Sequence, residues 1–167
     1  ASYAQTTGGS NTSVGYLAGY TNTTGTENTY VGLSAGQLNS SSSYNTAIGN
    51  QALQNNTASY NTALGRTSLA INTSGAYNTA AGMHSLYNNT TASDNTAVGY
   101  AALFTNTTGA TNVAMGRSSL SALTTASFST AVGANSGYAA TTAAHCTLIG
   151  NDAGKSITTG GLNTCIG

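Results

Sequence analysis

One five-residue motif recurs along the whole chain, and it constrains the fold more than any other feature. A representative copy is Asn45-Thr46-Ala47-Ile48-Gly49, which generalises to Asn-Thr-x-apolar-Gly. The closing glycines are 17 residues apart, except for one step of 16 residues between Gly49 and Gly65. These glycines are Gly15, Gly32, Gly49, Gly65, Gly82, Gly99, Gly116, Gly133, Gly150 and Gly167. The sequence therefore predicts one repeat domain over residues 1–167, built from ten units.

The length of the unit favours a parallel β-solenoid. Helical repeats need about 33 residues or more, and each glycine inside a helix would cost about 1 kcal/mol relative to alanine. A unit of 17 residues suits one coil with two or three short strands and tight turns. Each strand would pair in parallel with its copies ~4.8 Å above and below. We therefore predict an all-β parallel β-solenoid, or β-roll, forming a rod about 45–50 Å long.

The motif also predicts the contents of the core. Its threonine and its apolar residue are two apart, so they share a face of the strand, and we place that face inward. The resulting apolar column is Val14, Val31, Ile48, Leu64, Ala81, Val98, Met115, Val132, Ile149 and Ile166. The motif glycine would turn the corner, where a positive φ or a close backbone approach excludes a side chain.

Asparagines recur at two places in the unit, and stacked amides can hydrogen-bond along the axis of a parallel stack. The motif asparagine ladder is predicted at Asn11, Asn28, Asn45, Asn61, Asn78, Asn95 and Asn112. A second asparagine ladder is predicted at Asn22, Asn39, Asn56, Asn72, Asn89 and Asn106. Both ladders lapse in the last third of the chain.

Composition excludes several classes of partner. Charged residues make up 4% of the chain and the formal net charge is zero, so we expect neither nucleic acid nor an anionic membrane surface as a partner. No apolar run is long enough to span a bilayer, and Ala1-Ser2-Tyr3-Ala4 lacks the pattern of a signal peptide. A near-neutral surface favours self-association.

Catalysis and metal binding are not expected, and we predict no cofactor. The three acidic residues lie more than three coils apart, roughly 15 Å along the axis, and the two histidines occupy different places in distant coils. These residues are Glu27, Asp94, Asp152, His84 and His145. Asp152 and Lys155 are interpreted as a surface ion pair. Cys146 and Cys165 should lie about 8 Å apart, beyond the ~7 Å limit for a disulfide, so we expect two buried thiols, with an intermolecular bridge as the alternative.

Three groups are candidate surface features. The leucine column either completes the core or, facing outward, forms a lateral subunit interface; it consists of Leu53, Leu69, Leu86, Leu103 and Leu120. Tyr44, Tyr60 and Tyr77 should stack, either as an aromatic ladder or as a sugar-stacking platform. Candidate acceptors for N-glycosylation are Asn22, Asn39, Asn72, Asn89 and Asn106.

The motif resembles that of a known family. The copies at 45–49, 61–65 and 95–99 are similar to the Ser-Val-Ala-Ile-Gly repeats of the YadA-like head domains of trimeric autotransporter adhesins, and to related phage tail-fibre repeats. The resemblance covers the whole chain, with one motif per coil. It implies a left-handed parallel β-roll, three chains side by side, and an extracellular adhesive rod on a cell surface or virion.

These observations predict a non-enzymatic structural or adhesive protein that forms, or belongs to, an extracellular fibre. Its partners would be copies of itself, as a trimer or head to tail, since Ala1 falls in the third place of a unit and Gly167 closes one. The alternative is a ligand-binding solenoid for surface glycans or ice. An inward threonine column would argue against ice; its first members are Thr12, Thr29, Thr46, Thr62 and Thr79.

Overall fold

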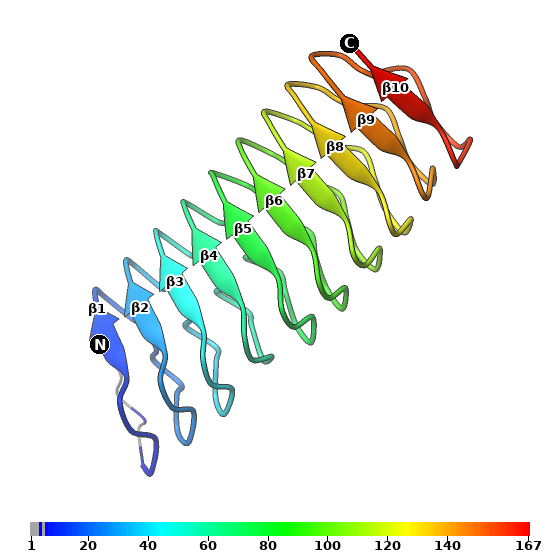
Figure 1. The fold of residues 1–167 in the computed structure, drawn as a ribbon. Helices are drawn as coiled ribbons and strands as arrows, with labels where there is room; N and C mark the ends of the chain where they lie inside the picture. The colour runs from blue at the N-terminus through cyan, green and yellow to red at the C-terminus, as the bar shows by residue number, and fades with distance from the viewer. Residues whose placement is uncertain (1–3, 5) are drawn as a thin grey trace.

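The computed structural model describes residue 4 and residues 6–167, which form a parallel β-solenoid. Ten strands lie side by side in one sheet, in chain order (Figure 1). They are β1 (Thr12–Val14), β2 (Thr29–Val31), β3 (Thr46–Ile48), β4 (Thr62–Leu64), β5 (Thr79–Ala81), β6 (Thr96–Val98), β7 (Val113–Met115), β8 (Thr130–Val132), β9 (Thr147–Ile149) and β10 (Thr164–Ile166). The all-β solenoid predicted from the repeat is confirmed. The expected place of Ala1 lies outside the described residues.

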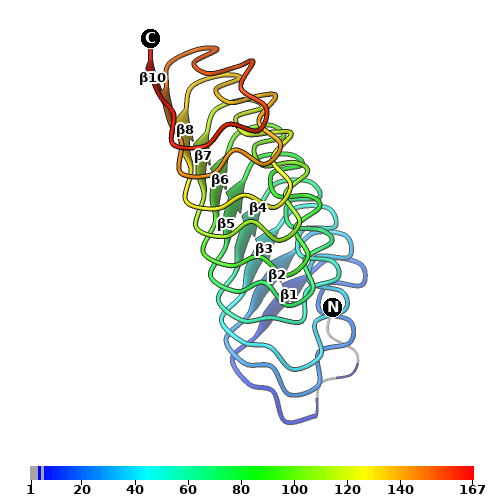
Figure 2. The ribbon, with the colours of Figure 1, turned by 90° about the vertical axis from the view of Figure 1, so that its right-hand side faces the viewer.

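Equivalent motif residues pair with each other in every step of the sheet. Thr46 of β3 lies opposite Thr62 of β4, and Ile48 lies opposite Leu64. The register is kept across the shorter unit, so the missing residue is absorbed in a turn. Figure 2 shows the successive coils superposed along the rod, with the strands along one side and the turns winding around the other.

Each described coil contains one three-residue strand, whereas two or three strands were expected. The other sides are built from turns because the backbone repeatedly enters the left-handed region, with φ between 48° and 64° at non-glycine residues. Extended strands cannot continue through such residues. The turns still hydrogen-bond from coil to coil, as in Leu86 N–H to Ala102 O at 3.0 Å and Thr73 N–H to Thr90 O at 2.9 Å.

The inward face of the sheet is the opposite of the one predicted. The middle residue of the strand points inward and is fully buried, as at Ala47, Ala63 and Ala97. The apolar column faces outward, with Ile48 and Met115 each 43% exposed. The coil is thin, and its interior is already occupied by leucines and asparagines from the turns. Only a side chain the size of alanine fits beneath most strands.

The leucine column completes this core. Leu53, Leu69, Leu86, Leu103 and Leu120 are all fully buried. The outward alternative, a lateral interface made by these leucines, is therefore wrong, because a side chain sealed inside one chain cannot contact a second.

The sizes of the strand residue and of the turn residue that faces it compensate for each other across the core. Where the middle strand residue is large, as at Tyr30 and Leu148, glycine replaces leucine on the facing turn. A Cβ built on Gly36 would lie 2.3 Å from the Tyr30 ring, and one built on Gly137 or Gly154 would lie 2.7 Å from Leu148. Tyr30 and Leu148 thus occupy the volume that leucine fills elsewhere.

The two predicted asparagine ladders are present, and their members are buried except Asn11, which is partly exposed. In the motif ladder, each Oδ1 accepts the backbone N–H of the next asparagine, as from Asn95 to Asn78 at 3.0 Å. Each Nδ2 generally donates to a turn carbonyl of the next coil, as from Asn78 to Ala92 O at 2.8 Å. In the second ladder, amide-to-amide hydrogen bonds run from Asn56 to Asn106, as from Asn89 Nδ2 to Asn72 Oδ1 at 2.8 Å. Asn22 and Asn39 are buried in the same column but donate to turn carbonyls. The amides therefore satisfy buried backbone groups that the turns leave unpaired.

Candidate functional site

The outward face of the sheet, which we call the strand face, combines the threonine column with the apolar column. The threonine column begins each strand, and only β7 has valine there instead. The two columns hold no charged residue between them. Several apolar members are substantially exposed, including Leu64 at 39% and Ile149 at 41%. The rod therefore carries an uncharged, partly apolar strip along its length.

The strand face is regular in one column and uneven in the other. The threonine column is nearly uniform. The apolar column varies in size from Ala81 to Met115, and it includes branched and unbranched side chains. This face is consequently a surface of shallow steps.

The predicted tyrosine stack lies two residues before the strands β3, β4 and β5. Tyr44 and Tyr60 have ring centroids 5.0 Å apart and planes within 8°, and Tyr60 and Tyr77 repeat that spacing within 5°. The aromatic ladder is thus confirmed. Each ring covers a face of its neighbour, so the middle ring offers its edge to a ligand. Sugar stacking on this ladder remains an untested prediction.

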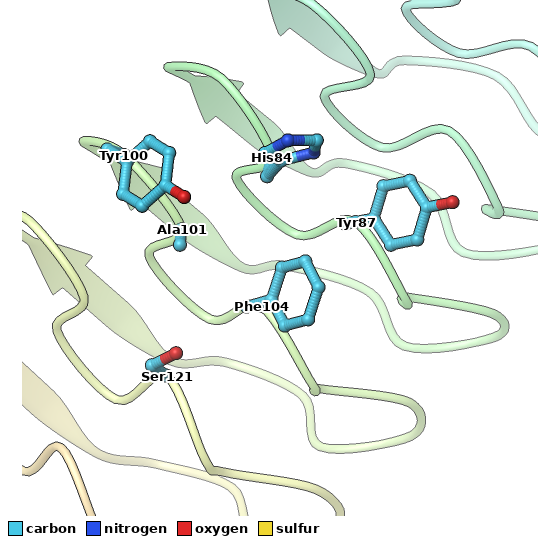
Figure 3. Close-up of a pocket in the computed structure, with 6 residues that line it drawn as sticks. All are labelled: His84, Tyr87, Tyr100, Ala101, Phe104 and Ser121. Carbon is cyan, nitrogen blue, oxygen red and sulfur yellow. The ribbon is translucent and has the colours of Figure 1, made fainter.

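A hollow lined by aromatic residues lies on another side of the coil, on the turns that follow β5, β6 and β7 (Figure 3). Its volume is about 480 Å³. We call it the aromatic hollow, and it is lined by His84, Tyr87, Tyr100, Ala101, Phe104 and Ser121. The lining contains no carboxylate, amine or guanidinium group.

The aromatic hollow combines one stacked pair of rings with a histidine ring that stands nearly perpendicular to its neighbours. Tyr87 and Phe104, which occupy equivalent places in adjacent coils, stack with centroids 5.5 Å apart and planes within 11°. The His84 ring stands at 80° to Tyr87, 80° to Tyr100 and 90° to Phe104. In Figure 3 the Tyr87 hydroxyl points away from the other labelled side chains, while the Tyr100 hydroxyl points toward the group.

The hydrogen bonds of Thr67 indicate which ring nitrogen of His84 carries a proton. Its Nδ1 lies 2.7 Å from Thr67 Oγ1, and the Thr67 hydroxyl donates to Arg66 O at 2.7 Å. A hydroxyl has one proton to donate. Both contacts are satisfied together when His84 Nδ1 carries the proton, which leaves Nε2 as an acceptor.

A second hollow, of about 370 Å³, lies farther along the rod between Arg117, Ser118, Asn135, Tyr138 and Lys155. At its border Lys155 Nζ pairs with Asp152 Oδ1 at 3.1 Å, as the sequence predicted. The hydrogen bond that Asn135 donates to Asp152, together with that from Lys155, lowers the pKa of this exposed carboxyl. Arg117 is the other cation at this hollow.

The five candidate glycosylation sites are buried. Asn22, Asn39, Asn72, Asn89 and Asn106 are all fully shielded from solvent. Their Nδ2 atoms donate inside the coil, as from Asn72 to Gly75 O at 2.8 Å. A glycan needs an accessible amide nitrogen, so modification of these residues is incompatible with the folded coil.

The remaining candidate residues stay dispersed. Among the described residues no group of three or more His, Cys, Asp or Glu side chains could hold a metal ion. Cys146 and Cys165 form no disulfide with each other, as predicted. Cys146 is buried, but Cys165 is partly exposed, so the prediction that both thiols are buried is wrong for Cys165. The described part of the chain also contains no helix long and apolar enough to cross a bilayer.

Sequence reasoning missed the aromatic hollow because it draws on three places in the unit at once. A signal was present: aromatic residues recur at the fifth place after the motif glycine in adjacent coils, at Tyr87 and Phe104. Comparison of the chain with protein-family models, curated proteins and solved structures gives no match.

Proposed function

We propose that this chain is a non-enzymatic structural protein, a rod-shaped part of an extracellular fibre or adhesin that associates laterally with copies of itself through the strand face. The observation that carries the proposal is the outward orientation of the apolar column. A continuous strip of exposed apolar side chains is unusual on a monomer and typical of an interaction surface.

The size of the strand face fits an association between chains. Nine steps of ~4.8 Å give a length of about 43 Å, and a strip about 15 Å wide then has an area on the order of 600 Å². A standard protein interface buries about 800 Å² per partner. The tyrosine stack, which precedes three of the strands, adds to this area.

A second copy of this chain is the partner that best matches the steps of the strand face. Both chains would present the same repeat of ~4.8 Å, so the ridges of one can enter the grooves of the other along the whole rod. Neither face holds a charge in its two central columns, so no ion has to be desolvated without a partner. Three copies around a common axis, as the resemblance to adhesin heads implies, would each use the same face.

The test is the mass of the purified full chain in sedimentation equilibrium. We expect a multiple of the 16.5 kDa chain mass, and we expect the double variant Ile48→Glu, Leu64→Glu to sediment as one chain, because four buried carboxylates in a dimer would lack partners. Leu38→Glu is the matched control, since Leu38 is equally exposed, at 46%, but lies on a turn. A wild-type chain that stays monomeric at its highest soluble concentration would refute the proposal.

One observation favours a second candidate function, ice binding. The threonine column faces outward, contrary to the prediction that had argued against ice, and it presents methyl and hydroxyl groups at a spacing of ~4.8 Å. The uneven apolar column weakens this candidate, because the flat surface of an ice crystal requires a flat protein face. Thermal hysteresis that is abolished by Thr62→Tyr, and retained by Leu38→Glu, would support ice binding; its absence in the wild-type chain removes it.

A further inference from the structure

The aromatic hollow carries an inference that is independent of lateral association. We propose that it is a carbohydrate site that holds one pyranose ring of a neutral oligosaccharide. None of its lining residues belongs to a strand, so the site and the strand face use different sides of the coil.

The hollow lies where a small residue follows a larger one in two columns of the repeat. Ala101 follows His84 at the second place after the motif glycine, and Ser121 follows Phe104 at the fifth. The cavity of about 480 Å³ between them lies within the range of about 300–1,000 Å³ typical of small-molecule sites. Tyr100 at its rim is 48% exposed, so the hollow opens to solvent and an oligosaccharide can extend beyond it.

The perpendicular rings suit a pyranose better than a flat ligand. A sugar chair has a face of C–H groups and a rim of hydroxyls, and aromatic ring faces accept C–H groups because their π-electron density is negative. Tyr87 and Phe104 are stacked on each other, so they leave no slot in which a planar ring could be sandwiched. His84, at 80–90° to three other rings, forms a wall to one side of them.

Three polar groups of the hollow can meet the hydroxyl rim. His84 Nε2 accepts a hydrogen bond in the neutral tautomer whose Nδ1–H donates to Thr67 Oγ1. The hydroxyls of Tyr100 and Ser121 each donate and accept. No carboxylate, amine or guanidinium group lines the hollow, which favours a neutral sugar over a uronate or a sulfated sugar. This combination of apolar faces and a few neutral polar groups is characteristic of sites that bind sugars and other neutral polar ligands.

The experiment is saturation-transfer NMR and titration calorimetry on the full chain, with gluco-, galacto- and manno-configured neutral tetrasaccharides as probes. We expect saturable binding of at least one probe. Ala101→Gln should weaken it by about tenfold or more by filling the floor of the hollow. This change is compatible with the backbone, because Gln51 occupies the equivalent place with φ 58° and Ala101 has φ 53°.

A second variant in the hollow and two control variants outside it distinguish loss of the site from misfolding of the chain. Phe104→Ala should also weaken binding about tenfold, and Ala70 already occupies its place in another coil. Tyr138→Ala, at the same place two coils later, and Tyr60→Ala, in the tyrosine stack, should leave the affinity unchanged. The absence of binding to every probe, or affinity that persists in Ala101→Gln, would overturn the proposal. Loss of affinity in Tyr60→Ala alone would move the sugar site to the tyrosine stack and overturn it equally.

Discussion

The hydrogen bonds of Asn78 in the motif asparagine ladder allow the stability cost of replacing this residue to be predicted. Its Oδ1 accepts the backbone N–H of Asn95 at 3.0 Å, and its Nδ2 donates to Ala92 O at 2.8 Å and to Asn61 Oδ1 at 3.2 Å. Asn78 is 1% exposed. Asn78→Ala would therefore remove these bonds in a place that water does not reach.

The expected cost follows from which groups lose every partner. Ala92 O keeps a bond from Asn89 Nδ2 at 2.9 Å, whereas the Asn95 N–H loses the side chain that accepts it. A buried donor without a partner costs about 1–3 kcal/mol, and each lost hydrogen bond adds about 0.5–1.5 kcal/mol. We expect Asn78→Ala to lower the free energy of unfolding by about 2–4 kcal/mol, a large part of a typical total of 5–15 kcal/mol.

The chain contains its own matched control for this substitution. Ser129 stands in the same ladder, where its Oγ accepts Cys146 N–H at 3.2 Å and donates to Ala143 O at 3.2 Å. Serine can thus make both kinds of bond with longer contacts. We expect Asn78→Ser to cost about 1–2 kcal/mol, roughly half the cost of alanine.

Urea denaturation gives the global cost, and hydrogen exchange at the Thr96 amide gives the local one. Thr96 N–H donates to Asn112 O at 2.8 Å, directly after the affected residue, so its exchange reports opening of that coil. The reasoning would be refuted if alanine and serine cost the same, or if Asn78→Ala cost less than about 0.5 kcal/mol.

Three further predictions concern the backbone, the core and pH. Gly99→Ala should prevent folding, because its φ is 128° and its Cβ would lie 2.6 Å from Gly116 O, whereas Gly9→Ala, with nothing within 4 Å, should fold normally by circular dichroism. Leu86→Ala should lower the free energy of unfolding in urea by about 2–5 kcal/mol by opening a cavity; a cost under about 1 kcal/mol would contradict the burial of Leu86 in the core. Burial raises the pKa of the Tyr30 phenol, so its contribution to stability is complete below about pH 10, the ordinary tyrosine pKa, and is lost as the pH rises further. Thermal melts of Tyr30→Phe should accordingly show less loss above that pH than melts of the wild-type chain; equal losses would exclude this role for Tyr30.

The sequence was sufficient to predict the coil, the parallel stack and both asparagine ladders. The period gives the length of the coil, and identical residues in register give the ladders. It did not decide which side of the strand faces inward, since alternation shows only that Thr46 and Ile48 share a side. Side-chain volume decides that question: alanine at Ala47 is small enough for an interior shared with Leu53, and isoleucine is not.

The aromatic hollow could not be inferred by following one column of the repeat at a time. Its residues come from the first, second and fifth places of successive units, and each column taken alone shows only an irregular aromatic. The hollow appears when Ala101 and Ser121 are placed beside larger neighbours from adjacent coils. The repeat reflects the residues that the coils have in common, whereas the hollow depends on residues that differ between coils.

The matched sizes of the middle strand residue and the facing turn residue determine where coils can be added to such an array. Coils in the middle of the chain, with alanine under the strand and leucine on the turn, are interchangeable, so duplication of one of them joins compatible surfaces. A crossover that separates Tyr30 from Gly36, or Leu148 from Gly154, would set a large residue against leucine or leave a void. Gene rearrangement can therefore lengthen this rod by duplicating single coils from the middle. In the variant coils, the large strand residue and the glycine that faces it have to be inherited together.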